Sequence, residues 1–309
     1  MFHFRCISLF FLIASLAFGQ DEGEITQFNQ RLNQFINVRD FCISETGNEA
    51  YFTIQSPNQD ISQIAFMVKE NNEWSEPELL FFSDSFMYME PFLAPDNKRL
   101  FFVSNRPLDS TSKEKKDFDI WYVERKEEES DWSEPINLGA PVNSVNDEFY
   151  PTLSENNTIY YTLDAKSGFG KDDIYVSQWN GKNYEAPSIL PEAINSDGYE
   201  FNAFISKNED FLLYTKYGTP DGLGSGDLYL AKRDDQGNWQ KSMNIGTPIN
   251  TKYMEYCPFY DEKNQMLYFT SKRNNLMPRK FRNISDFKNT IEQSANGLSK
   301  IYQVKFQIE

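Results

Sequence analysis

The segment NLGAPVNS, residues 137–144, decides the fold because it returns further along the chain. It recurs as NIGTPINT at 244–251 and, in part, as LPEAINS at 190–196. A segment that returns in one order at a similar spacing is the signature of a repeat protein, in which each copy forms one structural unit.

Two further sequence motifs recur at a similar spacing. The motif Trp-Ser-Glu-Pro occurs at 74–77 and 132–135, with weaker copies that begin at Tyr184 and Trp239. A second motif, Asp followed by an aliphatic and an aromatic residue, begins at Asp119, Asp173 and Asp227. Three independent landmarks in one order indicate repeats of similar length through most of the chain.

Each repeat carries the pattern of four short strands. In the third copy, residues 148–153, 158–163 and 174–178 are β-prone, Asn180-Gly181 is a hairpin signal, and Tyr184 opens a fourth strand. A lone four-stranded sheet cannot bury both faces, so the copies must stack around an axis. The sequence therefore predicts an all-β fold, a single β-propeller of about five four-stranded blades.

The blade boundaries follow from the landmarks. Blades are predicted near 38–80, 88–144, 147–196, 198–251 and 253–309, with an insertion at 274–300 in the last. The last repeat ends after its third strand, and a ring leaves no sheet edge open. We therefore expect residues 24–28, within the N-terminal segment 20–37, to supply the missing strand and close the ring.

The first residues predict export. Arg5 precedes an apolar run over 7–18, and cleavage between Gly19 and Gln20 would remove a signal peptide of residues 1–19. We expect a periplasmic or cell-surface protein without a membrane span after cleavage. Cleavage also removes His3, the single histidine, which excludes histidine-dependent triads and the usual zinc sites. The net charge of −16 over the whole chain disfavours nucleic-acid binding.

With these landmarks in place, the chain resembles the WD40-like β-propeller repeat of exported bacterial proteins, which is related to the propeller of TolB. The segment NLGAPVNS, the acidic residue after it and the Asp-Ile-Tyr and Trp-x-x-Pro strands carry the resemblance, over about 38–308. The resemblance implies a binding or scaffolding propeller of the cell envelope, with no catalytic residues to carry over.

One acidic residue opens each predicted innermost strand, and together these residues are expected to form a ring at one mouth of the central channel. Such a ring could bind a cationic ligand or Ca²⁺, which prefers several oxygens, or supply the carboxylate pair of a glycoside hydrolase. The structural alternative is that each carboxylate caps its own turn. Apart from Ca²⁺, no cofactor is expected. The candidates are Asp40, Glu90, Glu148, Glu200 and Glu255.

Two cysteines remain after signal cleavage, and they occupy what look like matching places in the first and fifth repeats. Asp40-Phe41-Cys42 aligns with Glu255-Tyr256-Cys257. In an oxidising compartment a disulfide between Cys42 and Cys257 would clasp the ring, and two buried free thiols are the alternative.

The insertion in the fifth repeat departs most from the pattern. Ser285 is a plausible N-cap for a helix over 286–294, with Gly297 as its stop. Between 272 and 288 the chain has one acidic residue and six basic ones, so we predict a contact site for an acidic partner. The basic residues are Lys272, Arg273, Arg279, Lys280, Arg282 and Lys288.

Two functions from different classes remain open. The favoured one is a propeller that binds a protein or glycan of the cell envelope, without catalysis. The alternative is a carbohydrate-active enzyme that uses the carboxylates at the channel mouth. The regularity of the repeats favours the first, since an active site would make one or two blades differ sharply.

Overall fold

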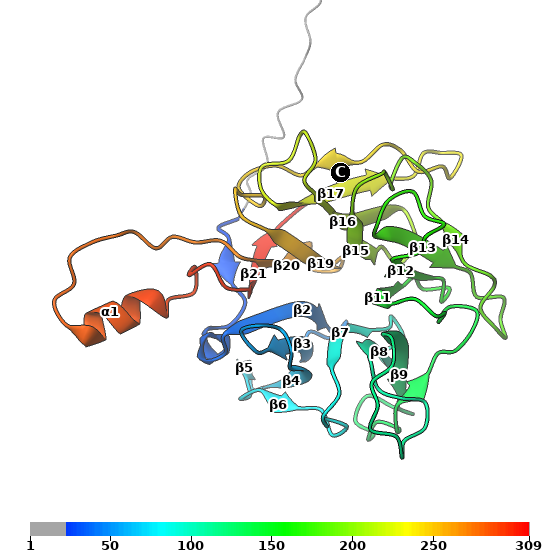
Figure 1. The fold of residues 1–309 in the computed structure, drawn as a ribbon, viewed down its shortest axis with the longest axis horizontal. Coiled ribbons are helices and arrows are strands. Elements are labelled where there is room, and N and C mark those ends of the chain that lie inside the picture. The colour runs from blue at the N-terminus through cyan, green and yellow to red at the C-terminus, as the bar shows by residue number, and fades with distance from the viewer. Residues whose placement is uncertain (1–22, 309) are drawn as a thin grey trace, which may run out of the picture.

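The repeats fold into five antiparallel sheets arranged around a common axis, as the sequence predicts (Figure 1). The computed structural model describes residues 23–308. The innermost strands of neighbouring sheets contact one another in a closed cycle, which makes the fold a five-bladed β-propeller. These innermost strands are β2 (Asn37–Ile43), β7 (Tyr88–Leu93), β11 (Glu148–Leu153), β15 (Glu200–Ile205) and β19 (Glu255–Asp261).

Each blade adds its outer strands in chain order. The second strands are β3 (Glu49–Gln55), β8 (Arg99–Ser104), β12 (Ile159–Leu163), β16 (Phe211–Tyr217) and β20 (Met266–Ser271). The third strands are β4 (Ser62–Glu70), β9 (Asp119–Glu124), β13 (Asp173–Ser177), β17 (Gly226–Lys232) and β21 (Lys300–Lys305). The outermost strands are short: β5 (Glu73–Trp74), β6 (Glu78–Leu79), β10 (Ile136–Asn137), β14 (Ser188–Ile189) and β18 (Met243–Asn244).

The N-terminal segment closes the ring, which confirms the prediction from the sequence. Strand β1 (Thr26–Gln27) pairs with β21, and so completes the fifth blade from the opposite end of the chain. The next residue, Phe28, packs its ring 4.5 Å from Phe41 and 5.4 Å from Trp74, both in the first blade. The closing strand therefore joins the fifth blade to the first, after the 3₁₀ helix η1 (Gln30–Gln34) leads into β2.

Every innermost strand contains a β-bulge at the same position. The register shifts in each of the five strands, and the first residue within the shifted stretch has a positive φ of 50–57°. These bulge residues are Asp40, Glu90, Tyr150, Asn202 and Cys257. A bulge turns one backbone N–H away from its own sheet, so this donor needs an acceptor from elsewhere.

Threonines of the preceding blade supply three of these acceptors. The hydroxyl of Thr53 accepts from the N–H of Glu90 at 3.0 Å, and Thr162 and Thr270 accept in the same way from the bulge residues Asn202 and Asp40. Each of these three contacts ties one blade to the next in the interior of the ring. Thr215 holds the equivalent position in the fourth blade, but its hydroxyl makes no hydrogen bond within residues 23–308.

The second blade departs from this rule because Val103 stands where the others have threonine. At this boundary the backbone N–H of Tyr150 donates instead to the carboxylate of Glu90, at 2.7 Å. Glu90 therefore performs the structural task of the missing hydroxyl.

Candidate functional site

A pit opens at the mouth of the channel where the innermost strands begin, which we call the proximal mouth. Its volume is about 230 Å³, and aromatic and methionine side chains form much of its wall. The lining residues are Arg39, Met89, Glu90, Phe149, Thr162, Asp172, Phe201, Asn202, Met254 and Tyr256.

Arg39 organises the polar part of the pit. Its Nε donates to Asp40 at 2.5 Å and its Nη2 donates to Glu90 at 2.9 Å, while its guanidinium lies 5.2 Å from the centre of the Tyr256 ring. Both carboxylates are buried. A buried carboxylate is tolerated when it is paired and hydrogen-bonded, so Arg39 is the residue that allows these two to lie together.

The thiol of Cys257 completes this network. Its Sγ donates to Asp40 at 2.8 Å, and burial raises the pKa of the Cys257 thiol well above its usual range. The group therefore stays protonated and serves as a hydrogen-bond donor. The sequence alone did not single out Arg39, Asn202 or Tyr256. Proline follows Glu90, Tyr150 and Cys257, and this shared pattern is the signal that would have aligned the bulges.

Two acids that line the pit have raised pKa values. Burial raises the pKa of Glu90, the nearby Asp40 adds to the rise, and Arg39 opposes it. Burial, followed by the charges of Asp164 and Asp173, raises the pKa of Asp172 to about 6. Carboxyl groups with raised pKa values are a recurring feature of active sites, although buried structural groups share it.

The predicted ring of five carboxylates is wrong in its geometry. Asp40 and Glu90 are bulge residues, whereas the three others lie two positions earlier in their strands, where the first and second blades have Val38 and Tyr88. The first two repeats lack the NLGAPVNS segment that would have fixed the alignment. The other three acids are Glu148, Glu200 and Glu255. Within residues 23–308, no group of three or more His, Cys, Asp or Glu is placed to hold a metal ion.

These three glutamates cap the turn before their own strand, which was the structural alternative. Glu148 accepts from the hydroxyl and backbone N–H of Ser144 at 2.6 and 3.0 Å. Ser196 donates to Glu200 and Thr251 to Glu255 in the same way. The repeated Ser or Thr four residues before each glutamate therefore has a local structural cause.

Cys42 and Cys257 are free, buried thiols in the structure, which is the second of the two alternatives that the sequence left open. The alignment that suggested a bridge is off by two residues, because Cys257 is a bulge residue equivalent to Asp40, whereas Cys42 follows the bulge and pairs across to Tyr51. Burial raises the pKa of Cys42 to about 12.

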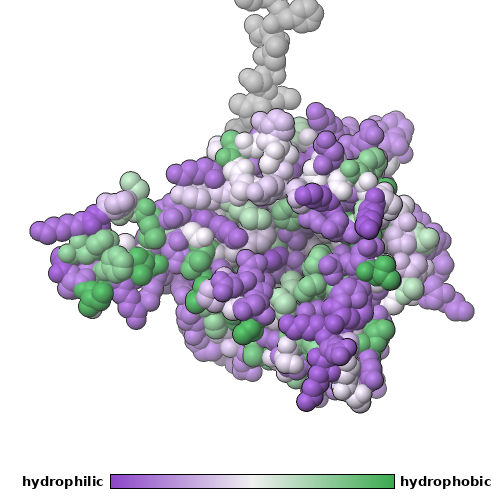
Figure 2. Space-filling model, in the orientation of Figure 1, coloured by the Kyte–Doolittle hydropathy of each residue, from purple (hydrophilic) through white to green (hydrophobic). Residues whose placement is uncertain are grey.

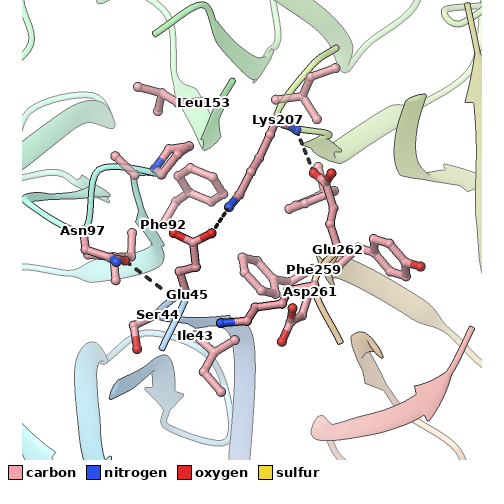
Figure 3. Close-up of a pocket in the computed structure, with 17 residues that line it drawn as sticks. Ile43, Ser44, Glu45, Phe92, Asn97, Leu153, Lys207, Phe259, Asp261 and Glu262 are labelled. Atoms are coloured by element: carbon pink, nitrogen blue, oxygen red, sulfur yellow. Dashed lines mark hydrogen bonds and ion pairs between the residues drawn. The ribbon is translucent and has the colours of Figure 1, made fainter. Parts of the chain in front are cut away.

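Figure 3 shows the residues that line a cavity at the opposite, distal mouth of the channel. A cavity of about 60 Å³ lies there, beside the packed rings of Phe92, Phe204 and Phe259. Lys207 crosses the opening and donates from Nζ to Glu45 at 2.8 Å. A cavity of this size holds no more than a few water molecules. A ligand therefore has better access to the proximal pit.

The insertion of the fifth blade forms a separate feature, residues 274–298, which we call the arm. It contains helix α1 (Ile284–Ile291) and extends away from the ring (Figure 1). The helix begins two residues earlier than predicted and is also shorter, because the side chain of Asn283, rather than that of Ser285, caps it by accepting from the N–H of Asp286 at 2.9 Å.

Four of the six predicted basic residues lie on the arm: Arg279, Lys280, Arg282 and Lys288. The other two belong to the body of the propeller, which corrects the prediction for them. Lys272 lies near the Tyr256 ring beside the pit, and Arg273 donates to the carbonyl of Ile249 while it packs on Tyr302. Among residues 23–308, no helix is long and apolar enough to cross a membrane.

Comparison with known proteins gives the fold. No protein-family model matches the sequence, and no curated protein is significantly similar to it. An α-L-arabinofuranosidase from Lactobacillus brevis is similar in structure with 15% identity and a TM-score of 0.53, over 87% of this chain and 93% of that one. The α-L-arabinofuranosidase PaAbf62A from Podospora anserina has 10% identity and a TM-score of 0.52, over 90% and 93%.

A more distant similarity connects the chain with TolB from Acinetobacter baumannii. The identity is 10% and the TM-score is 0.46, over 88% of this chain and 55% of that one, so the chain spans about half the length of that protein. Likeness to the two arabinofuranosidases at these identities shows the propeller fold alone. Membership of the WD40-like family stays a prediction.

The role of Glu90 can be tested by restoring the missing threonine. We expect Glu90→Ala to lower the free energy of unfolding by about 3 kcal/mol, because Arg39 and the N–H of Tyr150 each lose a buried partner. Val103→Thr in the same molecule should recover about 1 kcal/mol of this loss by accepting from Tyr150. Urea unfolding of both single variants and the double variant measures this coupling.

The matched control for that cycle is Val123→Thr, at a valine that is also fully buried. Combined with Glu90→Ala, it should show no recovery. Additive effects in both cycles would contradict the assignment of Glu90 as a substitute for the threonine hydroxyl.

Glu148 should make stability depend on pH. Burial raises its pKa from 4.5 to about 8, against the opposing effect of the bonds from Ser144. The stabilising share of a group whose pKa is raised by folding is complete below its unfolded pKa and is lost as the pH rises through the folded value. Glu148→Gln cannot ionise. Between about pH 5 and about pH 8, the free energy of unfolding of this variant should therefore rise relative to that of wild type by more than about 1 kcal/mol.

Unfolding midpoints in urea at several pH values across this window measure the effect. Glu129→Gln, at an exposed glutamate, is the control and should follow the wild-type curve. If Glu148→Gln also runs parallel to wild type throughout, the carboxyl group is ionised in the folded state and the assignment is wrong.

Proposed function

We propose that this protein is an exported propeller that binds an acidic protein or glycan of the cell envelope through its arm, and that it catalyses no reaction. The observation that carries the proposal is the exposure of the arm. Within the part of the chain that the structure describes, none of the eight residues of α1 is buried. An amphipathic helix exposed in this way is a common recognition element.

The arm has its own internal order, which supports a binding role. Arg279 forms a two-pronged ion pair with Asp286, at 2.7 and 3.1 Å, and the rings of Phe281 and Phe287 pack edge to face at 4.9 Å. At its base, Asn274 pairs with Asn296. A preorganised segment loses less conformational entropy on binding than a flexible loop does.

The hydrogen bonds that the carboxylates already make also favour binding over catalysis. Glu148 and its two equivalents cap turns, and both oxygens of Glu90 accept hydrogen bonds, from Arg39 and from Tyr150. A general acid or base must be free to exchange a proton with a substrate. A carboxylate that supports a blade boundary is poorly suited to that task.

Removal of the arm tests the proposal. We replace residues 275–297 by a short Gly-Ser linker and measure binding of purified protein to envelope fractions of the native host by co-sedimentation. The linker variant should lose most of the binding, and wild-type binding should weaken with added salt, since the contact is between opposite charges.

A loop of the second blade provides the matched control. Residues 108–113 form a surface loop with one acidic residue, Asp109, and one basic residue, Lys113, so their replacement removes a loop away from the arm without a change in net charge. This variant should bind like wild type. Undiminished binding by the variant without the arm would refute the proposal.

A glycosidase is the second candidate, and one observation favours it. Glu90 and Asp172 line the same pit with raised pKa values, and glycoside hydrolysis needs an acid with such a pKa beside a second carboxylate. The arabinofuranosidases that share the fold give a concrete substrate class to examine.

We expect no turnover of a panel of chromogenic glycosides, α-L-arabinofuranosides included, above the rate without protein. The panel is run with wild type, Glu90→Gln and Asp172→Asn. Turnover by wild type that both substitutions abolish would replace the binding proposal by the enzymatic one. Glu129→Gln is the control, because Glu129 is exposed and does not line the pit.

A further inference from the structure

The arm exposes an apolar stripe on one face of α1. Ile284, Phe287 and Ile291 are spaced so that they lie along the same side of the helix, and they are 78%, 40% and 41% exposed. Met277, on the strand-like segment before the helix, is 74% exposed. Hydrophobic and hydrophilic residues lie side by side on the visible surface of the arm (Figure 2). An exposed stripe with polar neighbours is typical of a contact surface.

Cations flank this stripe. The side chains of Arg282 and Lys288 are 86% and 67% exposed, and Lys280 is also exposed. Arg279 is held by Asp286 at 2.7 Å, whereas Arg282 and Lys288 make longer ion pairs, with Asp286 at 3.5 Å and Glu292 at 3.9 Å. These two side chains stay largely exposed, so together with Lys280 they provide the positive charge that the arm presents to a partner. The partner that fits is therefore apolar at its centre and negative around it.

The wall of the first blade has this chemistry. A groove of about 660 Å³ runs between the outer edge of the first blade, at β6, and the loop that precedes Trp132 in the second blade. We call it the groove. Leu79 and Phe81, on its rim, are 52% and 55% exposed, and the rings of Tyr51, Phe66 and Trp132 lie within it.

The groove is also strongly acidic. Its one basic residue, Arg125, is already paired with Glu49 at 2.7 Å and stacked 4.3 Å from the centre of the Trp132 ring. Six carboxylates line it: Glu49, Glu78, Glu128, Glu129, Asp131 and Glu134. Charge of one sign in a concave surface concentrates the potential and attracts a segment of the opposite charge.

We infer that the arm of one molecule docks into the groove of a second copy. The inference rests on the proposed function, since it names the acidic partner of the arm. Both surfaces combine exposed apolar side chains with charge, and the signs are opposite. Each molecule carries one arm and one groove at different places, so the contact is head-to-tail and links copies into a chain or a ring.

The association is expected to be weak. An eight-residue helix with its flanks buries less than the roughly 800 Å² per partner of a standard interface. Dissociation constants in the micromolar to millimolar range fit such a contact, and salt should raise them because exposed charges provide part of the attraction.

Sedimentation velocity on the purified chain tests the inference. From about 1 µM to about 500 µM, the average mass of wild type should rise, and about 0.5 M salt should reverse the rise. Reversal of the three arm charges should weaken association by about tenfold or more. The arm variant is Lys280→Glu, Arg282→Glu and Lys288→Glu.

The groove variant should also associate more weakly than wild type, because its arm is intact but no groove is available to bind it. It carries Glu129→Lys, Asp131→Lys and Glu134→Lys. All three positions are exposed, so the fold should be retained, which a circular-dichroism spectrum checks. A control with the charge change of the arm variant at exposed lysines elsewhere should associate like wild type: Lys113→Glu, Lys115→Glu and Lys252→Glu.

A mixture of the arm variant and the groove variant gives the most decisive test of the inference. The arm variant has a usable groove and the groove variant has a usable arm, so an equal mixture should associate although neither variant does so alone. Wild type alone should grow beyond pairs or close into rings. Association that neither variant shows alone supports the inference, and a mixture that stays monomeric while wild type associates contradicts it.

Other occupants give different outcomes. Wild type that stays monomeric throughout overturns self-association, and if the arm is still required for envelope binding, the proposed function survives without it. Arm-dependent co-sedimentation with vesicles of phosphatidylcholine and phosphatidylglycerol, by a protein that remains monomeric, would identify an anionic membrane as the partner and overturn the inference.

Discussion

The structure depends on a backbone donor that no blade can satisfy alone. Each innermost strand bulges at the same residue, and the N–H that the bulge turns away from its sheet is buried between blades. A buried donor without a partner costs about as much as a lost hydrogen bond or more. The hydroxyl of a threonine in the preceding blade meets this need at Asp40, Glu90 and Asn202. The blades are therefore linked by geometry as well as by apolar packing.

This constraint explains the polar centre of the channel. Where the second blade has Val103, the carboxylate of Glu90 takes the place of the hydroxyl, and a buried carboxylate then needs a cation. Arg39 supplies that cation, and its second contact holds Asp40. The cluster that resembles an active site in its composition therefore has a structural role at this blade boundary.

Much of the fold could be predicted from the sequence, because the repeat landmarks lie in turns and outer strands where local chemistry fixes them. The three repeated motifs together indicated the number of blades, and the missing strand of the last repeat indicated the closure by β1. The site could not be predicted in the same way. An alignment error of two residues leaves the in-and-out alternation of side chains unchanged, so Asp40 and Glu90 were aligned with Glu148, although they are equivalent to Tyr150.

The blades of a closed ring have similar surfaces. A partner can therefore recognise a specific site mainly where the chain differs from the repeat. The arm is such a departure, and it does not disturb the blade that carries it. Ser271 still pairs with Lys300 across the insertion, and the Asn274–Asn296 bridge closes the base of the arm. Because the ladder is complete below the arm, its sequence is free to change without loss of the ring. The arm is basic, whereas the rest of the molecule is acidic, and its sequence can change at little cost in stability. Such an element can acquire a binding function.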